Sequence, residues 1–138
     1  MLLRIIGLYG HGDCGKSEAL NALKELLREK GKSISAKPHP WSEMPETFEY
    51  KGSVVCVAPG GDDKAKLHEN ILYFKAKKCD VAITATRCKG GSVEELQKYA
   101  KEEDVAIEWI QKSYEYNLSD EIQALCNRET ASVIFEMI

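Results

Sequence analysis

The sequence predicts an α/β fold, a three-layer sandwich in which a mainly parallel sheet of five strands lies between two layers of helices. Short, almost continuous apolar segments rich in β-branched residues alternate with longer segments in which apolar residues recur at helical spacing. This alternation is typical of parallel strands joined by right-handed helical crossovers. The chain of 138 residues has the size of one ordinary domain, so we expect a single domain over residues 1–138.

The strands are expected where the apolar segments are short. They are LLRIIGLY (2–9), SISAK (33–37), SVVCVA (53–58), DVAITA (80–85) and VAIEWIQ (105–111). The irregular stretch 37–52 has two interpretations. It is either a functional loop, as long loops in compact domains often are, or it includes a hairpin in which TFEY, a turn at Lys51 and Gly52, and SVVCV add an edge strand.

Four helices are expected between and after the strands. The first runs from Ser17 to a C-cap at Gly31, and the third begins at the capping-box pattern Ser92-Val93-Glu94-Glu95. The faces expected to be buried are Leu67, Ile71 and Phe74 in the second helix; Val93, Leu96, Tyr99 and Ala100 in the third; and Ile122, Leu125, Val133, Ile134 and Met137 in the last, which starts near Ser119.

The first strand leads into the first helix through a glycine-rich loop. Residues 10–17, GHGDCGKS, fit the pattern of a glycine, any four residues, a glycine, a lysine and a serine or threonine. Glycines let consecutive backbone N–H groups point at phosphate oxygens, and the N-terminus of the helix adds its positive dipole end. The pattern predicts a nucleoside triphosphate site made by Gly10, His11, Gly12, Asp13, Cys14, Gly15, Lys16 and Ser17. We also expect Cys14 to be reactive, since an electropositive helix N-terminus favours its thiolate.

On these eight residues, and on their position between a strand and a helix, the chain resembles the P-loop NTPase superfamily with its Walker A motif, in particular the kinase-like branch. The resemblance implies a catalytic Lys16 on the β- and γ-phosphates and a Ser17 hydroxyl on Mg²⁺. It also implies the strand order 2-3-1-4-5. ATP is the expected nucleotide, because the sequence has no guanine-reading Asn-Lys-x-Asp motif.

The superfamily normally supplies a second carboxylate to the metal at the end of an apolar strand. Here the acids come late, as Asp62 and Asp63 behind Pro59, Gly60 and Gly61. Each aspartate is a candidate to return through the two glycines and hold a metal-bound water, and each is also a natural N-cap for the next helix. Both roles stay open, one for each aspartate, with Asp62 better placed for the metal.

Arg87 follows the fourth expected strand. The carboxyl ends of the strands face the ligand in such sheets, so Arg87 is expected on the phosphate side. The resemblance assigns it a catalytic role, in which it stabilises charge on the transferred phosphoryl group. The alternative is a solvated basic loop before a helix.

Charge and cysteine content narrow the partners and the compartment. The net charge of -3 implies no general attraction to nucleic acid or to an anionic membrane. No apolar run approaches the length of a membrane span. The five cysteines are odd in number and scattered, which is typical of reduced thiols, so we expect a cytoplasmic protein.

Two functions are consistent with these features. The first is an ATP-binding, Mg²⁺-dependent protein that transfers or hydrolyses the γ-phosphoryl group, a small kinase-like NTPase. The second is a nucleotide-binding module or switch with negligible turnover of its own, whose late acids reflect catalysis that is lost or is supplied by a protein partner.

Overall fold

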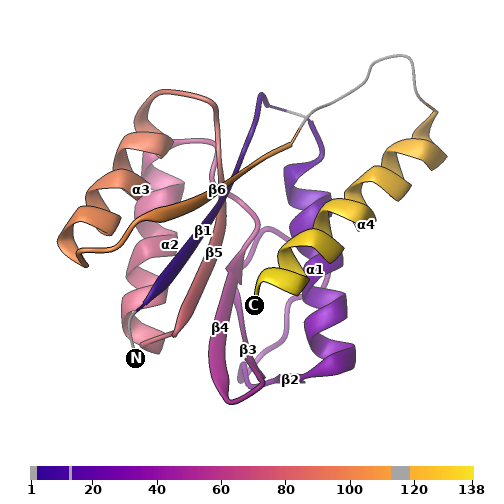
Figure 1. The fold of residues 1–138 in the computed structure, drawn as a ribbon, viewed down its shortest axis with the longest axis horizontal. Helices are drawn as coiled ribbons and strands as arrows, with labels where there is room; N and C mark the ends of the chain where they lie inside the picture. Colours follow the sequence, from indigo (N-terminus) through magenta and orange to yellow (C-terminus); the bar gives the residue numbers. More distant parts are fainter. Residues whose placement is uncertain (1–2, 13, 113–118) are drawn as a thin grey trace.

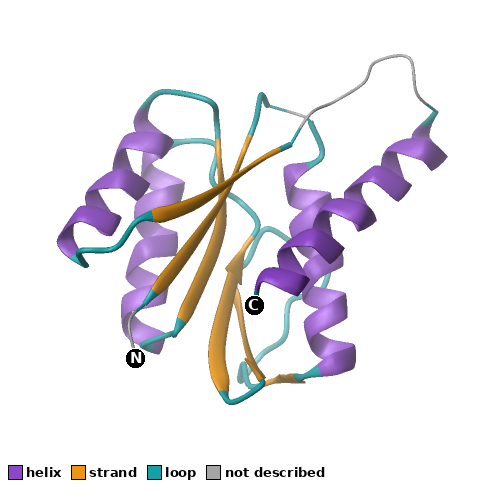
Figure 2. Cartoon of the chain, in the orientation of Figure 1, coloured by secondary structure: helices purple, strands orange, loops and turns teal. Residues whose placement is uncertain are grey.

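The computed structural model describes residues 3–12, 14–112 and 119–138, and within them it contains six strands and four helices (Figures 1 and 2). The strands are β1 (Arg4–Tyr9), β2 (Lys32–Ser33), β3 (Glu46–Tyr50), β4 (Ser53–Ala58), β5 (Val81–Thr86) and β6 (Ile107–Gln111). The helices are α1 (Lys16–Lys30), α2 (Lys64–Lys77), α3 (Gly91–Glu102) and α4 (Asp120–Met137).

The strands form one mixed sheet in the order β2-β3-β4-β5-β1-β6. Strands β4, β5, β1 and β6 run parallel, whereas β3 is antiparallel to both β2 and β4. The α/β class is thus confirmed, but a mainly parallel sheet of five strands is wrong. The extra strand is β3, the first arm of the hairpin that the sequence left open. Its turn has positive φ at both Lys51 (51°) and Gly52 (78°), as tight two-residue hairpins require.

The expected strand order is also wrong, because β5 lies between β1 and β4. In a right-handed crossover, the face of the sheet that the helix covers fixes the direction in which the chain moves across the sheet. It does not fix how many strands the chain passes. All six residues of β5 are buried, and the small side chains of Ala82 and Ala85 leave room for helices on both faces. The expected second strand shrinks to the two residues of β2 at the edge.

The helices complete three layers around this sheet (Figure 1). One hydrophobic cluster joins α1 and the C-terminal part of α4 to one face, to which β1 contributes Ile6 and Leu8. The other cluster joins α2 and α3 to the opposite face, to which β1 contributes Ile5. This alternation along β1 is what a strand buried on both faces requires.

The limits of the first expected helix and the buried face of the second are confirmed. Helix α1 ends at Gly31, whose N–H donates to the Leu27 carbonyl at 2.8 Å. Helix α2 buries Leu67, Ile71 and Phe74.

The start of α3 differs from the expected capping box. Its N-cap is Gly90, and the Ser92 hydroxyl instead accepts the Arg87 N–H at 3.1 Å, which ties the end of β5 to the helix. Leu96, Tyr99 and Ala100 are buried as expected, but Val93 is only half-buried.

The expected buried face of α4 is mostly wrong. Ile134 is buried and Met137 partly so, whereas Ile122, Leu125 and Val133 are 44%, 61% and 50% exposed. Helix α4 packs on α1, and its N-terminal half extends away from the sheet, so among the described residues Ile122 and Leu125 have no sheet face to bury against (Figure 1).

The turn between β4 and α2 crosses over the end of β5 with no room for a side chain. A Cβ atom built at Gly61 would overlap the Ala85 carbonyl oxygen. The turn is fixed from below by the buried Asn70 of α2, whose amide donates to the Gly60 carbonyl and to Thr84 Oγ1. Thr84 Oγ1 in turn donates to the Ala58 carbonyl at 3.0 Å.

Replacing Gly61 with alanine is expected to destabilise the protein by about 1–3 kcal/mol, the usual cost of forcing extra volume into a packed site. Gly60→Ala is the matched control, because the atoms nearest to a Cβ there belong to side chains, Lys66 Cε at 3.0 Å and Glu43 Cβ at 3.3 Å, and not to the backbone. Urea unfolding of both variants measures the difference. Equal stabilities for the two variants would contradict the close crossing at Gly61.

Candidate functional site

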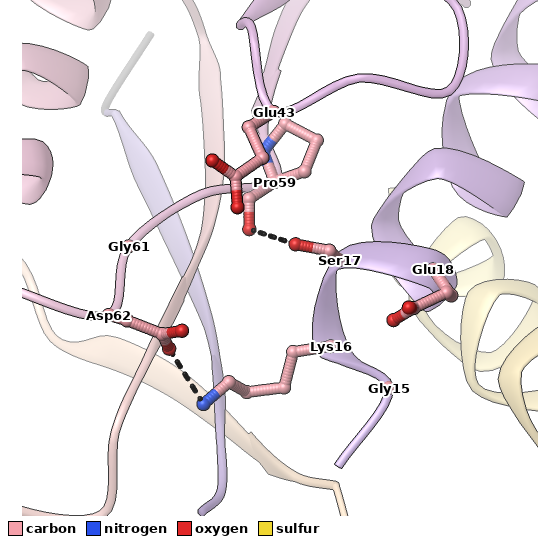
Figure 3. A pocket seen from close by; sticks show the side chains of 8 residues that line it. All are labelled: Gly15, Lys16, Ser17, Glu18, Glu43, Pro59, Gly61 and Asp62. Atoms are coloured by element: carbon pink, nitrogen blue, oxygen red, sulfur yellow. Dashed lines mark hydrogen bonds and ion pairs between the residues drawn. The ribbon is translucent and has the colours of Figure 1, made fainter. Parts of the chain in front are cut away.

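The glycine-rich loop lies at the edge of the sheet where all four parallel strands end (Figure 1). A cavity of about 190 Å³ opens there at the N-terminus of α1 (Figure 3). It is lined by Gly15, Lys16, Ser17, Glu18, Glu43, Pro59, Gly61 and Asp62. Asp13, another expected loop residue, lies outside the described residues.

Lys16 is buried, and its amine is held over the loop. Lys16 Nζ donates to the Gly10 carbonyl at 2.7 Å and to the His11 carbonyl at 3.3 Å. It also lies 3.3 Å from Asp62 Oδ1 (Figure 3). Ser17 lies on the same turn of α1, and its hydroxyl donates to the Pro59 carbonyl at 3.4 Å. The lysine, the serine and the turn after β4 therefore converge on one cavity.

Gly15 needs to be glycine for two reasons. Its φ of 94° is left-handed, a conformation that other residues adopt only with strain. A Cβ atom at this position would also lie 2.5 Å from Asn127 Oδ1 of α4. The last glycine of the loop is thus pressed against the last helix.

The expected reactivity of Cys14 is wrong. The side chain is buried, and this burial raises the pKa of the Cys14 thiol more than the nearby charges of Lys16 and Lys112 lower it. The thiol is therefore kept protonated inside the loop.

The two aspartates divide the roles that the sequence left open. Asp63 is the N-cap of α2, since its Oδ1 accepts the Lys66 N–H at 2.8 Å. Asp62 is half-exposed and turns its carboxylate into the cavity beside Lys16 (Figure 3). The capping interpretation therefore fits Asp63, and the metal role stays a prediction for Asp62.

Glu43 is a cavity residue that the sequence did not single out. It belongs to the 38–45 loop, which buried polar side chains of α1 hold in place. Lys24 Nζ donates to the carbonyls of His39 and Met44 at 2.9 and 2.7 Å. Asn21 Oδ1 accepts the Ser42 N–H at 3.1 Å. The sequence contains one sign that α1 binds another segment. A lysine and an asparagine lie on the apolar stripe of the first helix, where a polar side chain needs a hydrogen-bond partner.

The side chains that line the cavity carry more negative than positive charge. One lysine faces the carboxylates of Glu18, Glu43 and Asp62. A free triphosphate would be repelled by this surplus of negative charge, whereas Mg²⁺ neutralises both the ligand and the acids. Among the described residues no group of three or more acidic, histidine or cysteine side chains is arranged to hold a metal ion.

Arg87 is exposed and reaches the loop from the end of β5. Its guanidinium would lie 3.2 Å from a Cβ atom at Gly12. On its other side is a hollow of about 260 Å³, lined by Tyr9, Arg87, Cys88, Val93, Gln97 and Trp109. The structure thus brings Arg87 to the middle of the glycine loop, but not among the residues that line the Lys16 cavity.

No family model, curated protein or solved structure matches this chain. In the part of the chain that the structure describes, no helix is long and apolar enough to cross a membrane.

The buried pair of Lys24 and Glu46 supports the 38–45 loop from within. Both side chains are inaccessible to solvent, with Lys24 Nζ 4.0 Å from Glu46 Oε1. Glu46 also pairs with Arg28 and accepts the Ser33 hydroxyl at 2.9 Å. Burial lowers the pKa of Lys24 from 10.5 to about 8, against the opposing effect of Glu46. The amine donates to loop carbonyls that would otherwise lose this hydrogen-bond partner.

Lys24→Met is expected to lower the free energy of unfolding at pH 7 by about 1–3 kcal/mol, since it leaves these carbonyls unpaired. In the wild type the unfolded chain binds more protons than the folded one between pH 8 and 10.5, because the pKa of Lys24 is lowered in the folded state. This group therefore makes stability rise with pH in that window, by at most about 1.4 kcal/mol per pH unit.

The measurement is urea unfolding at several pH values, with Lys30→Met on the exposed end of α1 as the control. The gap between wild type and Lys24→Met should widen from pH 8 to 10.5, while the gap to Lys30→Met stays constant. Parallel plots of the free energy of unfolding against pH for all three proteins would contradict a buried Lys24 amine with a lowered pKa.

Proposed function

We propose that this chain is a P-loop nucleoside triphosphate-binding protein, which uses Mg²⁺ to transfer or hydrolyse the γ-phosphoryl group of ATP. The observation that supports it is the convergence of Lys16, Ser17 and Asp62 on one cavity at the N-terminus of α1. Each of these groups meets a different requirement of phosphate chemistry. Lys16 supplies a cation, Ser17 a hydroxyl ligand for the metal and Asp62 a carboxylate.

In this proposal the backbone N–H groups of the loop and the N-terminus of α1 bind the phosphates. Lys16 exchanges its ion pair with Asp62 for the β- and γ-phosphates, which releases the carboxylate toward Ser17. Ser17 and Asp62 would hold Mg²⁺, which supplies charge neutralisation at the phosphates. Glu43 enters the same cavity from another segment and is the candidate to accept the proton of an attacking water or hydroxyl. Arg87, beside Gly12, would stabilise charge on the transferred group.

A second candidate function is a binding module or switch with negligible turnover. It is favoured by the arrangement of Lys16, whose amine is already paired with Asp62 and two loop carbonyls. In that case a protein partner would complete the catalytic groups. Phosphate release from Mg-ATP, with and without small hydroxyl-bearing acceptors, separates the two functions. The cytoplasmic location is part of the proposal, and it is supported by five cysteines that are all free thiols.

Lys16→Ala is expected to weaken ATP binding by about tenfold or more, because the amine meets phosphates and not the hydrophobic core. Lys30→Ala, at the exposed far end of α1, should bind as the wild type does. A fluorescent ATP analogue titrated against the three proteins, with unfolding curves for each, measures affinity and stability separately. Equal affinity of Lys16→Ala and wild type would refute the phosphate site.

The neighbouring aspartates provide a matched pair of variants. Asp62→Asn is expected to raise the Mg²⁺ concentration that half-maximal nucleotide binding requires, since it removes a charged metal ligand from the cavity. Asp63→Asn should leave the Mg²⁺ dependence unchanged, because asparagine caps a helix about as well as aspartate does. Magnesium titrations at fixed nucleotide concentration test this. If both variants titrate like the wild type, Asp62 has no part in binding the metal.

A further inference from the structure

The hollow on the other side of Arg87 from the glycine loop, here called the Trp109 hollow, lies between α3 and the strands β1 and β6. Its volume is about 260 Å³. Its lining residues come from four segments: Tyr9 of β1, Arg87 and Cys88 of the turn after β5, Val93 and Gln97 of α3, and Trp109 of β6. It shares no lining residue with the Lys16 cavity, so it is open to a different ligand.

The indole of Trp109 is fixed against β1, although 38% of the residue is exposed. A Cβ atom built at Gly7 of β1 would lie 2.7 Å from the Trp109 ring, so only glycine fits beneath it. Tyr9 follows two residues later on the same face of the strand and meets the indole edge to face, with ring centroids 5.7 Å apart. A glycine inside a buried strand weakens that strand. The chain thus accepts a cost in stability to hold an exposed aromatic ring in one place, as a stacking surface requires.

Arg87 supplies the charge of the Trp109 hollow. It is the one charged side chain among the described residues that line this hollow. Its guanidinium forms no hydrogen bond or ion pair with another described residue. A guanidinium binds a carboxylate through two parallel hydrogen bonds, and one carboxylate balances its single charge, whereas a phosphate group carries up to about two negative charges. The free guanidinium therefore suits a ligand with one carboxylate.

Helix α3 adds one apolar and one amide side chain to the same hollow. Val93 and Gln97 are four residues apart, so they lie on one face of the helix. Val93 offers a methyl surface to a flat ring, and the Gln97 amide both donates and accepts hydrogen bonds. Aromatic and apolar walls with a few polar groups are typical of a small-molecule site.

We infer that the Trp109 hollow is a binding site for a small aromatic carboxylate, whose ring lies against Trp109 and whose carboxylate pairs with Arg87. The inference goes beyond the proposed function and does not rest on it, because the hollow and the phosphate cavity have no lining residue in common. The guanidinium of Arg87 is also close to Gly12, so it would lie between this ligand and a nucleotide bound at the loop.

The test measures binding without nucleotide through the fluorescence of Trp109. The chain has two tryptophans, so in a Trp41→Phe background the tryptophan emission comes from Trp109 alone. Three probes are titrated: 4-hydroxybenzoate; 4-hydroxybenzamide, which lacks the charge; and cyclohexanecarboxylate, which lacks the flat ring. The 4-hydroxybenzoate anion should quench Trp109 and bind about tenfold or more tighter than either of the other two.

Two variants in this background separate Arg87 from general basic charge. Arg87 and Lys89 are exposed basic residues of the same turn, and of the two Arg87 alone lines the hollow. Arg87→Gln should weaken 4-hydroxybenzoate binding by about tenfold, and Lys89→Gln by less than about twofold.

Alkylation of cysteines locates the bound probe independently. Cys88 is an exposed free thiol that lines the hollow, whereas Cys126 is a partly exposed free thiol on α4. Saturating 4-hydroxybenzoate should slow the reaction of Cys88 with iodoacetamide and leave the reaction of Cys126 unchanged, as measured by mass spectrometry of the modified peptides.

The inference is overturned if 4-hydroxybenzoate leaves the fluorescence of Trp109 unchanged, or if the three probes bind alike. It is also overturned if Arg87→Gln and Lys89→Gln weaken binding equally, or if Cys88 reacts at the same rate with and without the probe. Failure of the proposed function looks different. Lys16→Ala would then bind ATP as tightly as the wild type does, and none of these nucleotide-free results would change.

Discussion

The passage of the β4–α2 turn over the end of β5 is the constraint on which the site depends. Because β5 separates β4 from β1, an acid directly after β4 would lie about two strand spacings, roughly 10 Å, from the glycine loop. The turn covers this distance only because Gly61 lies against the Ala85 carbonyl, and because Asn70 and Thr84 hold the turn from below. The result is a carboxylate of Asp62 at 3.3 Å from Lys16. The late position of the acids, which looked like a departure from the expected motif, follows from the strand order.

Helix α1 organises the opposite side of the cavity. Its first turn carries Lys16 and Ser17, and its next turns carry Asn21 and Lys24, which bind the 38–45 loop. One helix therefore sets the position of the cationic end of the site and, indirectly, of Glu43. A buried lysine is an expensive way to fix a loop, since its charge is lost from water. Its directional hydrogen bonds fix the position of the 38–45 loop, which apolar packing alone could not specify.

The parts of this fold that sequence patterns predicted are local ones. The segments of β1, β4, β5 and β6, the limits of α1 and the buried face of α2 depend on periodicity and capping within a few residues, and these were confirmed. The strand order had been taken from the family resemblance and was wrong, and the sequence alone does not fix it because a right-handed crossover leaves the number of strands passed undetermined. The prediction of the buried face of α4 was mostly wrong because a helical pattern does not reveal how many neighbours the helix has. In the site, the loop, Asp62 and Arg87 could be proposed from the sequence, whereas Glu43 could not. Its place depends on contacts between residues about 20 positions apart, such as Lys24 and Met44.

The sheet has two unequal edges. On one side the hairpin strand β3 is covered by β2, which has only two residues and so offers little backbone for another chain to pair with. On the other side β6 pairs with β1 alone within the described chain, over five residues, and Trp109 on it is 38% exposed. Any growth of the sheet by strand addition, whether in association or in aggregation, is therefore directed to the β6 side.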